Sequence, residues 1–97
     1  MPSVALGLAT MCLSTEFTLA NARTVLGRKG ADIALEDPEI SRHHCILEVR
    51  DEVVNLKDLD STNGTFFAEE RVRAAMLRNG DFFRAGSSTI RVSFLPR

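Results

Sequence analysis

The 97-residue chain is a series of short apolar stretches separated by turn residues. No long segment carries apolar residues at the period of about 3.6 residues that marks an amphipathic helix. Only residues 74–78 could form a helical turn, and these five residues are too few for a helix that stands alone. The pattern therefore predicts an all-β domain.

Several of the apolar stretches alternate with polar residues at the two-residue period of a β-strand. Residues 89–94 show the clearest alternation, and residues 45–49 and 54–57 follow it, although Ile46 is apolar on what should be the wetter face. Turn residues separate the stretches at Asp37-Pro38, Asp51-Glu52, Asn63-Gly64, Asn79-Gly80 and Gly86-Ser87. This punctuation predicts a sandwich of about eight or more short strands.

The composition limits what such a sandwich can do. With 44% hydrophobic residues, the chain can bury one modest core, so we expect residues 1–97 to form a single domain, taken from a longer protein. A formal net charge of -1 argues against a protein that coats nucleic acid or an anionic membrane. The longest apolar run, residues 4–13, is far short of the roughly 20 residues of a membrane span. It also lacks the preceding Lys or Arg of a secretory leader.

The two cysteines, Cys12 and Cys45, fit neither a disulfide framework nor the spacing of metal ligands. Their apolar neighbours predict that both are buried free thiols. A reducing compartment suits such thiols, so we expect the chain to be cytoplasmic.

Three segments place small or hydrogen-bonding residues in loops, where a sandwich tolerates almost any sequence. They are Gly27-Arg28, Ile40 to His44 and Asp58 to Thr65. In this order and spacing they resemble the forkhead-associated (FHA) domain, and the similarity runs from about Thr24 to about Phe94. Further matching positions are Asp32-Ile33, Leu77, Gly80-Asp81 and Gly86. Each element alone is common, but their ordered combination is specific.

The resemblance implies an FHA-like (SMAD/FHA) β-sandwich of about eleven short strands, in two antiparallel-rich sheets with binding loops at one end. It also implies a recognition module, not an enzyme, that binds phosphothreonine on a partner protein in signalling. Such a module needs no cofactor and no metal, and as an isolated domain we expect it to be monomeric. Neither nucleic acid nor a membrane is an expected partner.

The resemblance assigns five residues to the phosphopeptide. Arg28, Ser41 and Thr62 would hold the phosphate, whose charge of about -1.5 to -2 is best met by an arginine fork, hydroxyls and backbone N–H groups. Arg42 would add a second positive charge. Asn63 would bond the peptide main chain, since a carboxamide both donates and accepts.

Other matched residues are expected to support this site. His44 would tie the phosphate-binding loop to its neighbour by side-chain hydrogen bonds. Gly27 and Gly64 are expected where the backbone has a positive φ or approaches another segment closely, since glycine has no side chain. Loop bracing is the expected role of Asp32, Asp58 and Ser61.

One hairpin departs from the family pattern. Where the family usually has a second Asn-Gly turn, this chain has Phe67-Ala68-Glu69-Glu70-Arg71-Val72. We therefore expect a different turn there, with Glu69 and Glu70 facing water.

Other functions compete with phosphopeptide recognition. A metal site or nucleophilic pair at His43-His44-Cys45 is disfavoured, because consecutive strand residues point to opposite faces. A hydrolase triad using Ser61 or Thr62 lacks a nucleophile elbow. The main alternative keeps the fold but makes it a phosphate-independent interaction or dimerisation module.

Overall fold

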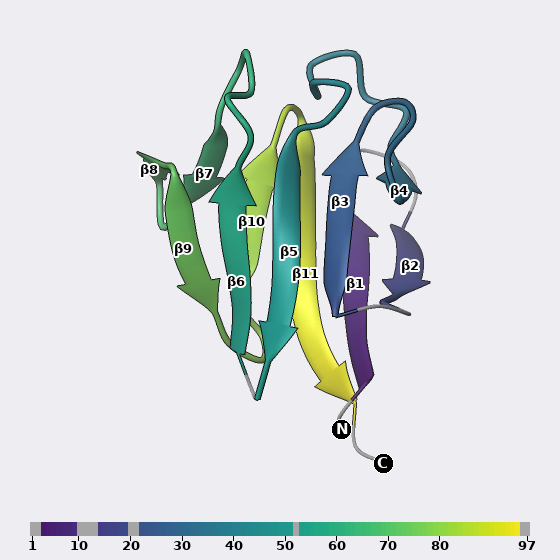
Figure 1. The fold of residues 1–97 in the computed structure, drawn as a ribbon, viewed down its shortest axis with the longest axis vertical. Helices are drawn as coiled ribbons and strands as arrows, with labels where there is room; N and C mark the ends of the chain where they lie inside the picture. The colour runs from purple at the N-terminus through teal and green to yellow at the C-terminus, as the bar shows by residue number, and fades with distance from the viewer. Residues whose placement is uncertain (1–2, 10–13, 20–21, 52, 96–97) are drawn as a thin grey trace.

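The computed structural model describes residues 3–9, 14–19, 22–51 and 53–95, and this part of the chain forms eleven strands and no helix. The strands form two sheets that pack face to face (Figure 1). The six-stranded sheet has the order β2 (Ser14–Thr18), β1 (Ser3–Ala9), β11 (Ser88–Leu95), β10 (Phe82–Ala85), β7 (Thr65–Phe67) and β8 (Glu70–Val72). The five-stranded sheet has the order β4 (Ile33–Ala34), β3 (Arg23–Gly27), β5 (Cys45–Arg50), β6 (Val53–Asp58) and β9 (Ala74–Leu77). The prediction of an all-β sandwich with eleven strands is confirmed.

The pairing is antiparallel between all neighbouring strands except β3 and β4, which run parallel. Strands β5 and β6 form a six-residue ladder from the pair Cys45–Asp58 to the pair Arg50–Val53. This ladder joins the two predicted loop segments that flank it, because His44 precedes β5 and Leu59 follows β6.

The core lies between the sheets and is built by the alternation seen in the sequence. On β6, Val54 and Leu56 are buried while Lys57 is exposed, and on β11 Ser88, Ile90 and Val92 are buried. The core cluster comprises Val4, Leu6, Leu26, Ile33, Leu35, Ile40, Cys45, Leu47, Val54, Leu56, Leu77, Phe83, Ala85, Ile90 and Val92. Burial of this apolar surface is the main force that holds the two sheets together.

The structure decides two local points that the sequence left open. Residues 74–77 form β9, an edge strand paired with β6, and not a helical turn. The pairing satisfies backbone groups of β9 and buries Leu77, and local helix propensity cannot anticipate such a partner. Ile46, expected on the wetter face, is 3% exposed, since its register partners Val25 and Lys57 flank it.

The apolar run near the start of the sequence contributes β1, which lies between β2 and β11. Val4, Ala5 and Leu6 are buried there. Cys12 falls outside the described residues, so the expectation about its burial is not addressed. No helix in the described ranges has the length and apolar character that crossing a membrane would require.

Candidate functional site

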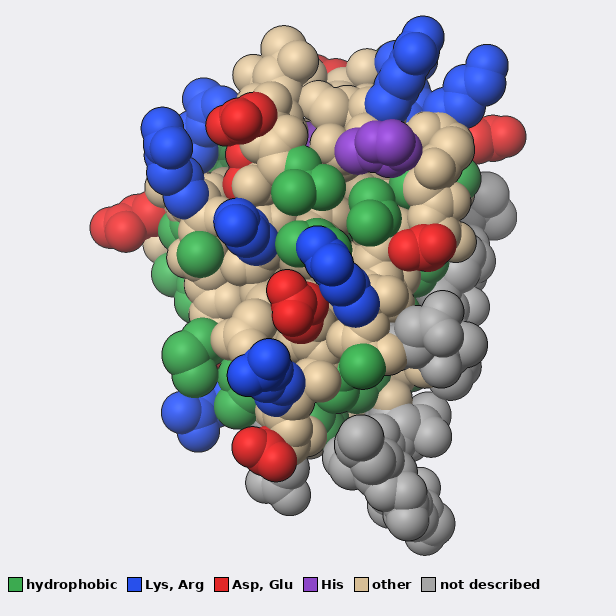
Figure 2. Space-filling model, in the orientation of Figure 1, with side chains coloured by type: hydrophobic (Ala, Val, Ile, Leu, Met, Phe, Trp, Pro, Cys, Tyr) green, Lys and Arg blue, Asp and Glu red, His purple; other side chains and the backbone are tan. Residues whose placement is uncertain are grey.

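The three polar segments singled out in the sequence lie at one end of the sandwich, opposite the end where β1 begins and β11 ends (Figure 1). They follow β3, precede β5 and follow β6. The turn between β10 and β11 reaches the same end. Figure 2 shows Lys and Arg side chains projecting around this end, near a histidine. The exposed cations in these segments are Arg28 and Arg42, and the exposed Lys29 follows Arg28 directly.

Gly27 lets the β3 end and the loop before β5 come into direct contact. A Cβ on Gly27 would lie 1.8 Å from the carbonyl oxygen of Arg42. The next residue continues the contact, because the N–H of Arg28 donates to the carbonyl oxygens of Ser41 (3.0 Å) and Arg42 (3.1 Å). Position 27 thus requires glycine because the backbone of Arg42 lies too close to admit a side chain.

The guanidinium of Arg28 is anchored by one edge. Its Nε donates to the carbonyl oxygen of Ile40 at 3.1 Å, which fixes the side chain over the loop before β5. Among the described residues, no hydrogen bond engages the two terminal NH2 groups of the fork, and the side chain is exposed. This arrangement orients the fork before any ligand arrives, which lowers the entropy lost on binding.

Ser41 and Thr62 connect the loop before β5 to the loop after β6. The N–H of Thr62 donates to Oγ of Ser41 at 3.0 Å. A serine hydroxyl that accepts this bond still has its own hydrogen to donate. Ser41 therefore keeps a hydroxyl donor on the loop whose Ile40 carbonyl anchors the Arg28 fork.

His44 is fully buried and bridges the same two loops. Its Nδ1 accepts from the N–H of Ser41 at 3.1 Å, and its Nε2 faces the carbonyl oxygen of Gly64 at 2.9 Å. Because a carbonyl can only accept and a backbone N–H can only donate, these partners define the neutral tautomer with hydrogen on Nε2. The imidazole is occupied on both nitrogens by scaffold contacts.

Asp58 organises the loop after β6. Its carboxylate accepts from the N–H of Ser61 (3.0 Å), the hydroxyl of Ser61 (2.5 Å) and the hydroxyl of Thr65 (2.7 Å). Burial acts to raise the pKa of Asp58, but these hydrogen bonds outweigh it and hold the pKa below its ordinary value. The Oγ of Ser61 also accepts from the N–H of Gly64 at 3.1 Å. The Ser61 hydroxyl is thus part of the loop framework.

A second aspartate, Asp37, ties the β10–β11 turn to the site. Its carboxylate accepts from the N–H of Glu39 (2.9 Å) and from the N–H of Ser87 and the hydroxyl of Ser88 (both 2.8 Å). Burial acts to raise the pKa of Asp37, and the hydrogen bonds lower it to a value below the ordinary one. Glu39 in turn offers its carbonyl oxygen to Nδ2 of Asn63 at 2.8 Å. Asn63 is therefore positioned from the loop before β5.

The neighbouring histidine and cysteine do not share a site with His44. His43 is exposed and its Nε2 donates to the carbonyl oxygen of Gly30 at 3.1 Å. Cys45 is a buried free thiol, and burial together with the charge of Asp58 raises its pKa to about 12. A thiol with such a pKa stays protonated and is a poor nucleophile.

A family model described as FHA domain matches residues 24–86, which is more than half of the chain. The chain belongs to the FHA domain family. The glycogen accumulation regulator GarA of Mycobacterium tuberculosis is 37% identical to it over 73 residues, 74% of this chain. The FHA domain-containing protein FhaA of the same organism is 35% identical over 75 residues, 76% of this chain. The chain spans 45% of the length of GarA and 14% of the length of FhaA.

Solved FHA domains share the whole fold. A structure from work on phosphothreonine-dependent FHA domain interactions has a TM-score of 0.87 and 33% identity, and covers 98% of this chain and 99% of its own. The FhaA FHA domain complexed with the intracellular domain of Rv3910 has a TM-score of 0.83 and 34% identity, and the match covers 93% of this chain and 99% of the FhaA domain. Mycobacterium tuberculosis EmbR, in complex with a low affinity phosphopeptide, has a TM-score of 0.82 and 27% identity, with 96% of this chain and 25% of EmbR covered.

In this FHA domain the five residues predicted to contact a peptide lie on adjoining loops of one end. Hydrogen bonds join Arg28 to Ser41 and Ser41 to Thr62, and Asn63 follows Thr62 directly in the chain. Arg42 is exposed, and its main chain, not its side chain, packs against Gly27. All five are exposed or half-buried at their side chains.

The sequence did not predict several groups that position the site residues. The carbonyl oxygens of Ile40 and Glu39 accept from Arg28 and Asn63, and main-chain acceptors carry no residue signature. Asp37 was seen only as part of a turn. Its bond to the N–H two residues later is an Asx-turn, and an aspartate before proline is a signal for one.

The β7–β8 hairpin of the FHA domain corrects one expectation. Ala68 (φ 52°) and Glu69 (φ 66°) both take the left-handed conformation that an Asn-Gly pair favours, so the turn is not of a different kind. Glu69 and Glu70 are exposed, as predicted. The turn keeps its shape because the pairing of Phe67 with Glu70 imposes it.

Proposed function

We propose that this FHA domain binds a phosphothreonine-containing segment of a partner protein, reversibly and without making or breaking a covalent bond. The observation that carries the proposal is the junction of Arg28 and Ser41. The N–H of Arg28 donates to the Ser41 carbonyl at 3.0 Å, and its Nε donates to the carbonyl of the preceding residue, Ile40, so the fork is anchored on the loop that carries the Ser41 hydroxyl.

The donors at this junction suit a dianionic phosphate. The fork of Arg28 supplies charge and paired N–H groups, while Ser41 and Thr62 supply hydroxyl donors. Arg42, exposed on the same loop as Ser41, adds positive charge. A few charge-assisted bonds to a short, flexible segment support an affinity on the order of micromolar.

Asn63 would hold the peptide main chain. One N–H of its carboxamide is bonded to the Glu39 carbonyl, which fixes the orientation of the group. The second N–H and the carbonyl oxygen remain for a ligand. A donor and an acceptor on one rigid group match the N–H and C=O of one peptide residue.

The relatives support a phosphorylated partner. The solved domains include one from work on phosphothreonine-dependent interactions and EmbR with a phosphopeptide. We extend this chemistry to the present domain, which acts on no substrate in our proposal. We further propose that residues 1–97 form one monomeric domain in the cytoplasm. The buried free thiol of Cys45 is compatible with a reducing compartment.

The deciding experiment compares two arginine variants. An array of phosphothreonine peptides first selects a binding sequence, and titration calorimetry then measures the wild type, Arg28→Ala and Arg91→Ala. Arg91 is an exposed arginine on β11, so Arg91→Ala matches the charge change outside the proposed site. We expect Arg28→Ala to abolish measurable binding with an unchanged fold by circular dichroism, and Arg91→Ala to bind normally.

The dephosphorylated peptide separates this proposal from the phosphate-independent alternative. Equal binding of both peptide forms, or unchanged affinity of Arg28→Ala, would refute a phosphothreonine module. Dimerisation of the purified domain at micromolar concentration would support an interaction surface independent of phosphate.

A further inference from the structure

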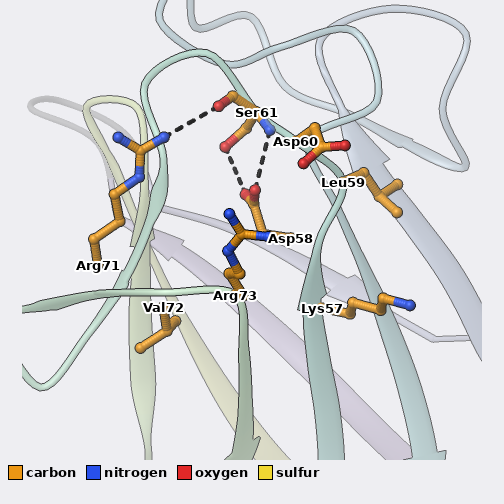
Figure 3. A pocket seen from close by; sticks show the side chains of 8 residues that line it. All are labelled: Lys57, Asp58, Leu59, Asp60, Ser61, Arg71, Val72 and Arg73. Carbon is orange, nitrogen blue, oxygen red and sulfur yellow. Dashed lines mark hydrogen bonds between the residues drawn. The ribbon is translucent and has the colours of Figure 1, made fainter.

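A groove of about 720 Å³ opens beside the proposed phosphate site, between the end of β6 and the segment that follows β8. Figure 3 shows the side chains that line it. They are Lys57, Asp58, Leu59, Asp60, Ser61, Arg71, Val72 and Arg73. The volume is within the range of pockets that bind small ligands or several side-chain atoms.

More positive than negative side chains line the groove. Three cations, Lys57, Arg71 and Arg73, line it, and all three are exposed. Of its two carboxylates, Asp58 is already occupied by the donors of Ser61 and Thr65. These donors are neutral and leave the negative charge of Asp58 in place, so Asp58 and Asp60 together leave the three cations with one positive charge in excess.

The cations come from two neighbouring segments, which touch where the N–H of Asp58 donates to the carbonyl oxygen of Arg73 at 2.8 Å. Lys57 comes from β6, while Arg71 comes from β8 and Arg73 follows it. The Nη2 of Arg71 donates to the carbonyl oxygen of Ser61 at 3.3 Å, which holds this guanidinium at the rim (Figure 3). An anion in the groove could meet the guanidinium groups of Arg71 and Arg73, while Lys57 points away from them and adds positive charge at the edge (Figure 3).

The groove and the phosphate site share a wall. Ser61 lines the groove, and the next residue, Thr62, donates its N–H to Ser41 in the phosphate site. A segment whose phosphate lies on Arg28 and Ser41 must leave the site over adjoining loops. Residues a few positions from its phosphothreonine can therefore reach the groove, since each extended residue spans roughly 3.3 Å.

We propose that this groove binds a second anionic side chain of the same partner segment, either a carboxylate or a second phosphate. This inference rests on the proposed phosphothreonine binding and adds a charge preference to it. Glu69 and Glu70, at the tip of the neighbouring hairpin, do not line the groove. Their exposed carboxylates repel acidic residues that pass over the hairpin but leave the groove cations free to bind.

The test uses four short peptides with one phosphothreonine. In the first peptide the flanking residues are alanine and serine. In the second and third they are aspartate, before or after the phosphothreonine, and in the fourth the more favourable aspartate is replaced by phosphoserine. Fluorescence polarisation measures each peptide with the wild type, Lys57→Gln/Arg73→Gln, Asp60→Asn and the control Arg91→Gln.

We expect one aspartate peptide to bind the wild type about five-fold more tightly than the neutral peptide, and the double variant to lose this advantage. Asp60→Asn should increase the advantage by about two-fold, since it removes the opposing charge and asparagine also tolerates the φ of 54° at this position. Arg91→Gln should keep the wild-type preference. The phosphoserine peptide identifies which anion the groove prefers.

The outcomes separate the two proposals. If the neutral phosphothreonine peptide binds but neither acidic flank improves affinity, or if Lys57→Gln/Arg73→Gln keeps the preference, the groove inference is wrong and the proposed function stands. If no phosphothreonine peptide binds the wild type, both are wrong.

Discussion

The carbonyl oxygen of Arg42 lies 1.8 Å from the position that a Cβ on Gly27 would occupy. The two residues are far apart in the sequence, and their contact sets how closely the loop before β5 approaches the end of β3. The Arg28 fork and the Ser41 hydroxyl are both positioned by this approach.

Gly27→Ala should therefore destabilise the domain by about 3 kcal/mol, because backbone, which cannot rotate away, must move to admit the methyl group. Urea unfolding followed by circular dichroism measures the change. Gly7→Ala is the matched control, since its Cβ would meet nothing closer than a carbonyl oxygen at 4.0 Å. An equal loss of stability in both variants would contradict the close-contact explanation.

Ser41→Ala should weaken phosphothreonine peptide binding by about ten-fold or more, since it removes a hydroxyl donor to a charged phosphate. Its effect on the free energy of unfolding should stay below about 1 kcal/mol, because the bond from Thr62 N–H that it loses is exposed to solvent. Titration calorimetry and urea unfolding of the same variant measure the two effects. A variant that binds like the wild type would remove Ser41 from the phosphate site.

Acid should destabilise the domain through Asp37 and Asp58. Hydrogen bonds hold both pKa values below the ordinary value of 3.8, so the unfolded chain binds protons more readily than the folded one. The stability from these groups is fully present above the ordinary value and is lost as the pH falls through the lowered folded pKa values. Urea unfolding between neutral pH and pH values below about 3.8 measures the loss.

Asp58→Asn is the control for this pH dependence. The substitution removes a titrating group, so the variant should be less stable at neutral pH and lose less stability on acidification. A wild-type stability that does not change across the acid range would show that these carboxylates do not couple folding to pH.

The β7–β8 hairpin should gain stability from the residues that its conformation favours. Ala68→Asn combined with Glu69→Gly should raise the free energy of unfolding by about 1 kcal/mol, because both positions have positive φ. For a domain of this size, that corresponds to an increase in Tm of roughly 5 °C. Thermal unfolding measures it, and an unchanged or lower Tm would show that the turn is not strained.

Much of the sandwich follows from local sequence. Alternating residues in 45–49, 54–57 and 89–94 predict strands because a strand places successive side chains on opposite faces. The exception at residues 74–77 shows the limit of such reasoning. This segment is a strand because β6 supplies hydrogen-bonding partners, and a short run of alanine, methionine and leucine carries no sign of that partner.

The sequence by itself determined the fold class, because periodicity and turn chemistry are properties of neighbouring positions. The residues expected at the site came from the resemblance of three ordered loop segments to the FHA domain. Only the tertiary structure decided that Gly27 serves a close backbone contact, that Ile40 and Glu39 orient Arg28 and Asn63 through their carbonyl oxygens, and that Asp37 joins the β10–β11 turn to the site. These relationships bring together groups that are distant along the chain. Most of them use backbone atoms that every residue possesses, so residue types in the sequence do not predict them.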